Sequence, residues 1–305
     1  MFRTVTVYRG EKITVRQGWM IVSSDQGEQQ LPIEDLYSIV IDNPQTVIST
    51  AAISQLTASG AHILICNEKH LPASVILPYN LHYHPLTVLR NQMSLPTEIQ
   101  DCLWDRIIKA KIENQALVLH YCGGEEKIVS RLRQLEQEVA NADEGNREGI
   151  AARLFFHGLY GSEFIRMNDD AINAALNYGY TVIRSAVAKA LAAYGYNCVL
   201  GLHHINESNA FNLADDMMEP LRPLVDLWVS ENSEDLVDKL TKQQRNELAA
   251  LVNDVVLWNG KRMRVRNAID KYISSLTTAI TRCDPESLFI PTIIRHDCYR
   301  DEDDA

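Results

Sequence analysis

The first 80 residues alternate between hydrophobic and polar positions with the period of two that is typical of β-strands. Residues 4–8 and 12–15 show the clearest alternation, and the three residues between them predict a hairpin turn. Residues 49–58 differ, because their spacing is helical and a glycine follows them as a stop signal. Runs of β-branched residues predict further strands at residues 20–22, 37–41, 62–66 and 74–77. We therefore expect a β-rich domain over residues 1–80.

Beyond residue 96 the hydrophobic positions recur with the period of a helix. Residues 81–96 contain Pro85 and Pro96 and are expected to form a linker. The first long helix is predicted over residues 97–120, with one stripe formed by Ile99, Leu103, Ile107, Ala110, Asn114 and Leu117. Further helices are predicted at residues 125–139, 146–157, 170–194, 208–230, 241–257 and 262–281. The pattern predicts an α+β chain whose N-terminal β-rich domain is followed by an all-helical C-terminal domain, residues 97–305.

The composition suits a folded protein, since 46% of the 305 residues are hydrophobic. A net charge of −11 argues against a nucleic-acid partner, but binding is local and five acids lie between Asp297 and Asp304. No apolar run approaches the ~20 residues that cross a bilayer, and no secretory signal is visible, so we expect no membrane partner and a cytoplasmic location. The six cysteines form no CxxC pair, which argues against a zinc site and a disulfide framework.

The candidate metal-binding side chains of the helical region are concentrated at residues 201–220. His203 and His204 precede three carboxylates on a predicted helix, Asp215, Asp216 and Glu219. Carboxylates three or four residues apart share a helical face, and they are costly to keep together without a cation beside them. A proline follows directly, where it removes a backbone donor. These residues favour a divalent metal site, and an acidic first turn stabilised by the helix dipole is an equal alternative.

Glu148 is a further candidate ligand on another predicted helix. The opposite face of that helix is very apolar, with Ile150, Leu154 and Phe155. A single glutamate on a helix is more often solvated than bound to a metal. Taken alone, Glu148 therefore remains open between a ligand and a surface residue.

Several segments together resemble the CRISPR-associated spacer-integration endonuclease, the metal-dependent integrase subunit of CRISPR adaptation. The Asn-Tyr-Gly-Tyr sequence at residues 177–180 and the short chain are similar to the form found in type II systems. The β-rich domain matches by its position and architecture more than by a motif. The matching segments are residues 148–152, 155–158, 166–180, 201–204 and 211–226.

The resemblance implies that Glu148, His204 and Glu219 bind Mg²⁺ or Mn²⁺ in the C-terminal catalytic domain. Asp216 matches an accessory acid near the metal, and His203 is the less favoured of the two histidines. Tyr178 is implied to lie near the active centre, where it would contact the scissile phosphate. Inward packing of its ring is an equal alternative.

Three other residues match the family pattern. Tyr160 is the next candidate after Tyr178, and Arg166 and Asn173 are implied to organise the site, although structural roles are as plausible. A basic run at residues 261–266 and three basic residues on an earlier predicted helix, Lys127, Arg131 and Arg133, could contact DNA. At least half of these are expected to face water instead.

The implied reaction is metal-dependent transesterification, in which a DNA 3′-hydroxyl attacks a phosphodiester and a spacer enters a CRISPR array. The implied partners are double-stranded DNA, a second copy of the chain, and a small ferredoxin-like protein that bridges two dimers into a heterohexamer. No Gly-x-x-x-x-Gly-Lys-Ser/Thr loop is present, in keeping with a reaction that needs no nucleotide hydrolysis. Two other hypotheses remain, a noncatalytic DNA-binding scaffold and a metal-dependent enzyme acting on a small phosphoester.

Overall fold

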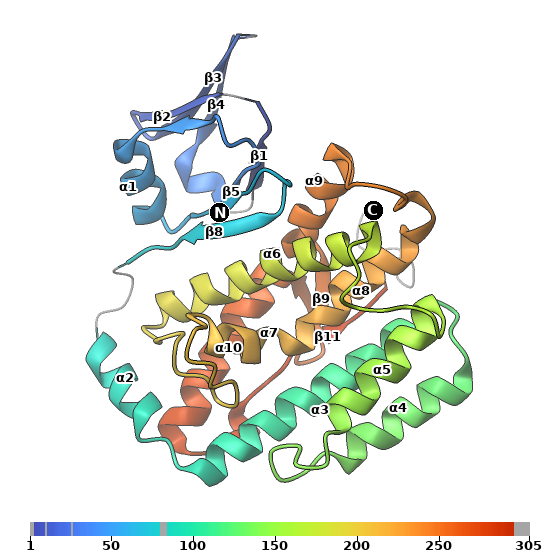
Figure 1. The fold of residues 1–305 in the computed structure, drawn as a ribbon. Helices are drawn as coiled ribbons and strands as arrows, with labels where there is room; N and C mark the ends of the chain where they lie inside the picture. Colours follow the sequence, from blue (N-terminus) through green and yellow to red (C-terminus); the bar gives the residue numbers. More distant parts are fainter. Residues whose placement is uncertain (1–2, 10, 26, 80–83, 296–305) are drawn as a thin grey trace, which may run out of the picture.

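A computed structural model describes residues 3–9, 11–25, 27–79 and 84–295, so the acidic C-terminal tail lies outside the described residues. A β-rich unit lies against a larger helical unit, and the long helix α6 (Ala171–Ala193) runs along their boundary (Figure 1). The expected α+β class is confirmed. In the described part of the chain, no helix is long and apolar enough to cross a membrane.

The N-terminal unit is built from two four-stranded sheets. Helix α1 (Thr50–Ala58), capped by Ser49, precedes strand β7 (His62–Cys66). Strand β5 (Leu36–Ile41) is buried along its whole length, as is typical of a strand covered on both faces. The first sheet has the order β1 (Arg3–Val7), β5 (Leu36–Ile41), β7 (His62–Cys66) and β8 (Pro72–Ile76), with only β8 antiparallel. The second sheet has the order β4 (Gly27–Pro32), β3 (Trp19–Ser24), β2 (Lys12–Arg16) and β6 (Val47–Ile48).

The hairpin expected between residues 4–8 and 12–15 does not form. Strand β1 pairs in parallel with β5, whereas β2 lies in the other sheet and pairs with β3. Gln17 and Gly18 have φ values of 51° and 80°, as a two-residue hairpin turn between β2 and β3 requires. Alternation identified both strands correctly, but it carries no information about which distant strand each of them pairs with.

The helical unit contains the predicted helices, with differences at the expected linker and within the helix expected over residues 208–230. The expected linker contains helix α2, while residues 80–83 of that segment lie outside the described residues. The helix expected over residues 208–230 is divided by a 3-10 turn at Glu219–Leu221, because Pro220 cannot donate a backbone hydrogen bond. The helices are α2 (Pro85–Met93), α3 (Thr97–Tyr121), α4 (Glu126–Glu138), α5 (Arg147–Tyr160), α6, α7 (Asn212–Met218), α8 (Arg222–Glu231), α9 (Lys242–Ala250) and α10 (Val265–Arg282).

The C-terminal unit is mostly helical rather than all-helical, because it also contains a three-stranded sheet. Its strands have the order β10 (Lys261–Arg264), β9 (Val255–Trp258) and β11 (Thr292–Ile293). Thr241 and Gln244 form a capping box at the start of α9. The predicted helix nevertheless ends at Ala250, and the next begins only at Val265.

The two units share a hydrophobic core. Tyr37 and Val40 of β5 and Leu64 of β7 pack in one buried cluster with residues of α3, α6, α8 and α10, while a second cluster lies inside the β-rich unit. A buried ion pair adds to this contact, since Arg245 Nε of α9 donates to Asp42 Oδ2 at 2.8 Å. The β-rich unit is therefore fixed to the helices that carry the candidate site.

Candidate metal centre

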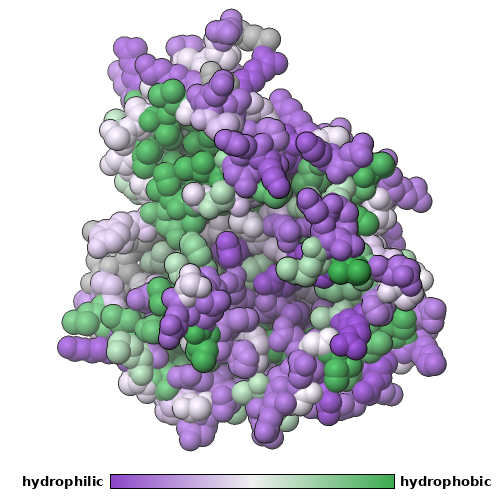
Figure 2. Space-filling view, in the orientation of Figure 1, coloured by the Kyte–Doolittle hydropathy of each residue, from purple (hydrophilic) through white to green (hydrophobic). Residues whose placement is uncertain are grey.

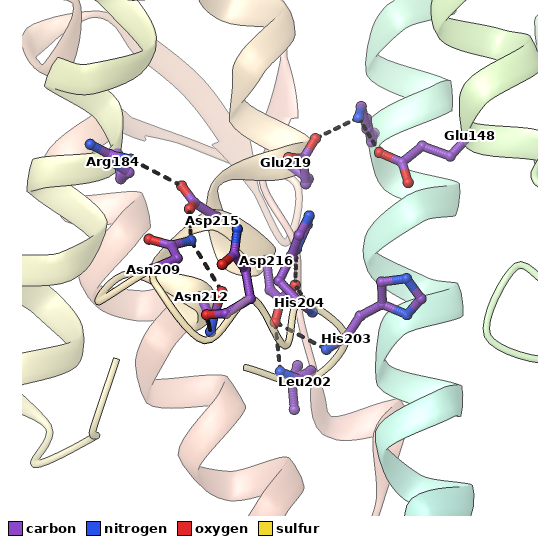
Figure 3. A network of polar contacts seen from close by, with 12 residues as sticks. Glu148, Arg184, Leu202, His203, His204, Asn209, Asn212, Asp215, Asp216 and Glu219 are labelled. Carbon is purple, nitrogen blue, oxygen red and sulfur yellow. Dashed lines mark hydrogen bonds and ion pairs between the residues drawn. The ribbon is translucent and has the colours of Figure 1, made fainter. Parts of the chain in front are cut away.

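A buried carboxylate holds the loop that carries His204. The Asp216 oxygens accept the backbone N–H groups of Leu202 (2.5 Å), His203 (3.1 Å) and His204 (3.1 Å). Asp216 Oδ1 also lies 2.5 Å from Nδ1 of the His204 ring (Figure 3). Because the carboxylate can only accept, Nδ1 carries the proton and Nε2 keeps the lone pair that binds a metal ion. This hydrogen bond raises the pKa of His204, against the effect of its burial.

Gly201 and Trp104 shape the same loop. A Cβ at Gly201 would lie 2.7 Å from Asp216 Oδ2 and still closer to the His204 carbonyl oxygen, so a side chain cannot fit there. The His203 ring stacks on Trp104 of α3, with centroids 4.3 Å apart and planes 1° apart. His204 meets the edge of the same indole at 5.7 Å. His203 therefore packs against α3 and does not share the position of His204.

Lys111 of α3 joins the two candidate glutamates. Its Nζ lies 2.6 Å from Glu148 Oε1 and 2.5 Å from Glu219 Oε2 (Figure 3). Glu148 occupies the first turn of α5, where Asp143 and Asn146 accept the backbone N–H groups of residues 147–149. Two carboxylates from distant segments thus converge on the same ammonium group.

The charge states of Glu219 and Lys111 depend on their neighbours. Burial alone would raise the pKa of Glu219, but Arg222 and Lys111 outweigh it and lower the pKa to about 2. Arg222 contributes through a 2.7 Å hydrogen bond from its Nε to Glu219 Oε1. Burial lowers the pKa of Lys111, while Glu219 and Glu148 raise it, and the net direction is upward. The carboxylate of Glu219 and the ammonium of Lys111 are both charged at neutral pH.

The donor set fits a divalent cation, although its members do not form a closed cage. Two carboxylates and one imidazole suit Mg²⁺ or Mn²⁺. Glu219 Oε2 is buried and has Lys111 as an ion-pair partner, yet no described donor meets it with hydrogen-bond geometry. Within residues 3–295, gaps excepted, no three His, Cys, Asp or Glu side chains are close enough to hold a metal ion. The ammonium of Lys111 lies between the two glutamates instead.

Asp215 points away from this group. Its Oδ2 accepts from Asn209 at 2.8 Å, and its Oδ1 lies 3.7 Å from Arg184 (Figure 3). Helix α7 begins at Asn212, so Asp215 lies in the first turn, where the helix dipole favours a carboxylate. The expectation that the helix already includes residues 209–211 was wrong, and the dipole alternative describes Asp215.

Asn114 fixes the turn that carries Glu219. Its buried Nδ2 donates to the carbonyl oxygens of Pro220 (2.7 Å) and Pro291 (3.1 Å), and its Oδ1 accepts from Ile293 N (3.1 Å). Lys111 lies one turn earlier on the same helix. The Asn114 amide therefore sets the separation between α3 and the Glu219 turn, a role beyond its predicted place in the helical stripe.

A cavity of about 150 Å³ opens beside Glu219. Tyr180 donates to the buried carboxylate of Asp226, and the guanidinium groups of Arg166 and Arg222 lie over the Tyr180 ring, 5.4 and 4.8 Å from its centroid. Figure 2 shows a hollowed, mainly hydrophilic surface over the middle of the helical unit. With Lys111 also in its wall, the cavity is lined by three cations and by the carboxyl groups of Glu219 and Asp226. The guanidinium groups could donate to a phosphate.

The structure does not bring Tyr178 to this centre. Its ring is fully buried, and its hydroxyl interacts electrostatically with Cys66, Asp42 and Arg245 at the boundary with the β-rich unit. Residues two apart on a helix face nearly opposite directions, so Tyr180 reaches the cavity and Tyr178 does not. Gly179 between them lets α8 approach, since a Cβ there would clash with Val225.

The other residues of the family pattern have structural partners. Arg166 donates to Asn173 Oδ1 (2.9 Å) and Asn177 Oδ1 (2.8 Å), which orients its guanidinium toward the cavity. Asn173 Nδ2 donates in turn to the Ile165 carbonyl oxygen at 3.0 Å. The Tyr160 ring packs on Phe164 with centroids 4.7 Å apart. Asn173 thus positions Arg166, whereas Tyr160 belongs to an aromatic cluster.

Several basic residues considered for DNA contact are used within the fold. Arg264 donates to the Asn253 carbonyl oxygen at 2.6 Å, and Arg266 donates to the Asn253 side chain. On α4, Arg131 pairs with Glu138 at 2.8 Å. These three arginines therefore have partners within the fold.

Asp226 gives a prediction for the dependence of stability on pH. Burial raises its pKa to about 7, although Tyr180 and Arg222 oppose the shift. The unfolded carboxyl loses its proton near pH 4, so the contribution of Asp226 to stability falls as pH rises from about 4 to 7 and is constant above. In Asp226→Asn the side chain cannot ionise, so this loss of stability at high pH should be absent. The difference in free energy of unfolding, variant minus wild type, should therefore be on the order of 2 kcal/mol larger at pH 8 than at pH 5. Denaturant unfolding at the two pH values measures this, and an equal difference at both would contradict it.

Comparisons with known proteins identify the family of the chain. A sequence model of the family "CRISPR associated protein Cas1" matches residues 5–254. The CRISPR-associated endonuclease Cas1 of Neisseria meningitidis serogroup C is 36% identical over 295 residues, covering 96% of this chain and 97% of its own.

Two solved structures have a similar fold. A casposase bound to an integration product superposes with a TM-score of 0.75 at 18% identity and covers 92% of this chain and 91% of its own. A chain of a Cas6-RT-Cas1–Cas2 complex gives 0.74 at 16% identity and covers 96% of this chain and 36% of its own. On the family match and the Neisseria relative, the chain belongs to the CRISPR-associated Cas1 family.

Proposed function

We propose that this chain is a metal-dependent DNA endonuclease and integrase that inserts spacers into a CRISPR array by attack of a DNA 3′-hydroxyl on a phosphodiester. The observation that carries the proposal is the convergence of Glu148 and Glu219, with His204 held in the metal-binding tautomer by Asp216. These three side chains would hold Mg²⁺ or Mn²⁺. The bound ion would lower the pKa of the attacking hydroxyl and neutralise charge on the phosphate.

The side chains around the centre have separable tasks in this reaction. Asp216 keeps the His204 ring in one orientation, and Arg222 holds Glu219 through its Nε. The guanidinium groups of Arg166 and Arg222 line the cavity, where they would bind the non-bridging oxygens of the scissile phosphate. Charge growing on those oxygens during transfer is stabilised most by donors that are already oriented.

The partners we propose are double-stranded DNA, a second copy of the chain and a small ferredoxin-like protein that joins two dimers. The complex that contains Cas1 and Cas2 and the casposase bound to its product support this arrangement by fold similarity. Trp19 and Val47 of the β-rich unit are exposed apolar residues, and Figure 2 shows apolar side chains gathered over this unit. Such a surface suits a contact between two copies.

The test is a strand-transfer assay with the purified chain, its small partner, a DNA duplex with free 3′-hydroxyls and a supercoiled repeat-containing plasmid. Joined product is expected with Mg²⁺ or Mn²⁺ and not with EDTA. Joining that proceeds without divalent ions would contradict the proposed metal dependence, and absence of joining with either ion would favour a noncatalytic DNA-binding scaffold. Hydrolysis of a small phosphoester in place of DNA joining would contradict the assignment of DNA as substrate.

A further inference from the structure

Lys111 occupies the space where a cation between Glu148 and Glu219 would have to lie. Its Nζ is 2.6 Å from Glu148 Oε1 and 2.5 Å from Glu219 Oε2, and its side chain is only 9% exposed. Two carboxylates this close repel each other in a buried site unless a positive charge separates them. The ammonium group therefore supplies the charge that a divalent ion would otherwise supply.

A second position for the same ammonium exists one helical turn away. Gln115 lies four residues after Lys111 on α3, and both side chains line the cavity beside Glu219. Gln115 Oε1 is buried and accepts no hydrogen bond from the described residues. A buried acceptor without a donor costs free energy until a donor reaches it. The Asp226 carboxyl in the same wall would add to the attraction.

We propose that Lys111 is a displaceable counter-cation, which bridges Glu148 and Glu219 in the metal-free protein and moves to Gln115 Oε1 when a divalent ion binds. The inference rests on the proposed metal site. Each bound ion must displace the ammonium, so Lys111 stabilises the metal-free fold and weakens metal affinity. The displaced charge moves into the cavity that would receive the DNA phosphate, so metal binding prepares that cavity for substrate.

The decisive variant is Lys111→Met, which keeps the length of the side chain and removes its charge. We expect the full-length variant to bind Mn²⁺ at least about tenfold more tightly than wild type in calorimetry or by the EPR signal of free Mn²⁺. We also expect it to melt at a lower temperature without metal and to show a larger rise in melting temperature on adding Mn²⁺. Equal or weaker Mn²⁺ binding by the variant would overturn the proposal.

Two controls separate displacement from a general change in charge. Lys109→Met removes the same charge from the opposite side of α3 and should leave Mn²⁺ affinity close to the wild-type value. Arg222→Met removes a cation that contacts only Glu219 of the two glutamates. If only the loss of a positive charge mattered, Lys111→Met and Arg222→Met would increase Mn²⁺ affinity by similar factors. Displacement predicts a clearly larger increase in Mn²⁺ affinity for Lys111→Met.

Gln115→Leu tests the second position without removing the cation. It should weaken Mn²⁺ binding several-fold in the wild-type background and have no effect beside Lys111→Met, because the coupling requires the ammonium. If Gln115 has a purely structural role, Gln115→Leu would change Mn²⁺ affinity equally in the wild-type and Lys111→Met proteins, and this result would contradict the proposal. If Lys111→Met does not fold, Gln115→Leu in the wild-type background still tests the proposal: weaker Mn²⁺ binding supports it, and unchanged Mn²⁺ binding contradicts it.

Failure of the metal site itself gives a different result. If wild-type Mn²⁺ binding survives in Glu219→Gln, the ion does not bind at these carboxylates and the proposed metal site is wrong. If Glu219→Gln abolishes binding while Lys111→Met leaves it unchanged, only the role of Lys111 is wrong.

Discussion

Replacing Glu219 with glutamine is expected to reduce strand transfer about a thousandfold and to destabilise the fold by about 3 kcal/mol. The first effect follows from loss of a proposed metal ligand. The second follows because Arg222 and Lys111 both pair with this buried carboxylate and would be left without their charge partner. The strand-transfer assay measures the first effect, and denaturant unfolding measures the second.

Glu148→Gln separates the two effects. Glu148→Gln should reduce strand transfer as strongly as Glu219→Gln, because it removes another proposed metal ligand. It should lower the free energy of unfolding much less, because the Glu148 side chain is 28% exposed. Glu144→Gln, an exposed glutamate four residues earlier, is the matched control and should change neither quantity. Strand transfer by Glu148→Gln within a few-fold of wild type would remove this residue from the proposed ligand set.

Replacing Asp216 with asparagine is expected to lower the free energy of unfolding by about 3 kcal/mol and to abolish Mn²⁺ binding at His204. An amide has one oxygen, so its NH₂ group would face backbone N–H groups that the carboxylate now accepts. The His204 ring would also lose the acceptor that fixes its tautomer. Amide hydrogen exchange at residues 202–204 should become faster.

Asp215→Asn is the control for this result. Asp215 is the neighbouring residue, but its carboxylate pairs with Arg184 and Asn209, whereas the backbone N–H groups of residues 202–204 donate to Asp216. Its replacement should leave Mn²⁺ binding and hydrogen exchange in residues 202–204 unchanged. Equal exchange rates in Asp216→Asn and Asp215→Asn would show that Asp216 does not hold the loop.

Residue chemistry alone left the metal site undecided, and Glu148, His204 and Glu219 were selected as a ligand set only through the family resemblance. The resemblance implied that Asp216 lies near the metal, but its bonds to the His204 ring and to three backbone N–H groups were not predicted. Spacing along a chain does not report backbone direction in a loop. The exclusion of a side chain at Gly201 is visible only once the loop is folded around Asp216.

Lys111 and Asn114 were missed as site residues for a different reason. Both lie on a helix whose hydrophobic pattern was read correctly, and a lysine beside Ile107, Ile108 and Ile112 was the available signal. A buried lysine is rare unless it is paired, so its position pointed to an acidic partner. Which carboxylates it meets depends on the packing of α3 against α5 and the Glu219 turn, which the sequence pattern does not contain.

The errors in the fold have equally specific causes. Asn259-Gly260 is a strong hairpin signal, with φ values of 49° and 73° in the structure, but the charged run that follows was interpreted as the start of a helix. Tyr178 was assigned to the active centre by resemblance, although its neighbour two residues later faces the cavity. A motif identifies the helix that carries a function, and the helical phase decides which residue reaches it.

The amide of Asn114 also bears on how the protein can be engineered. Because it holds Pro220 and Ile293 at once, a truncation or fusion tag that disrupts β11 would loosen the turn that carries Glu219. Loss of activity after such an alteration would reflect a displaced carboxylate and not a missing functional segment. Tags are therefore better attached to the chain beyond Arg295.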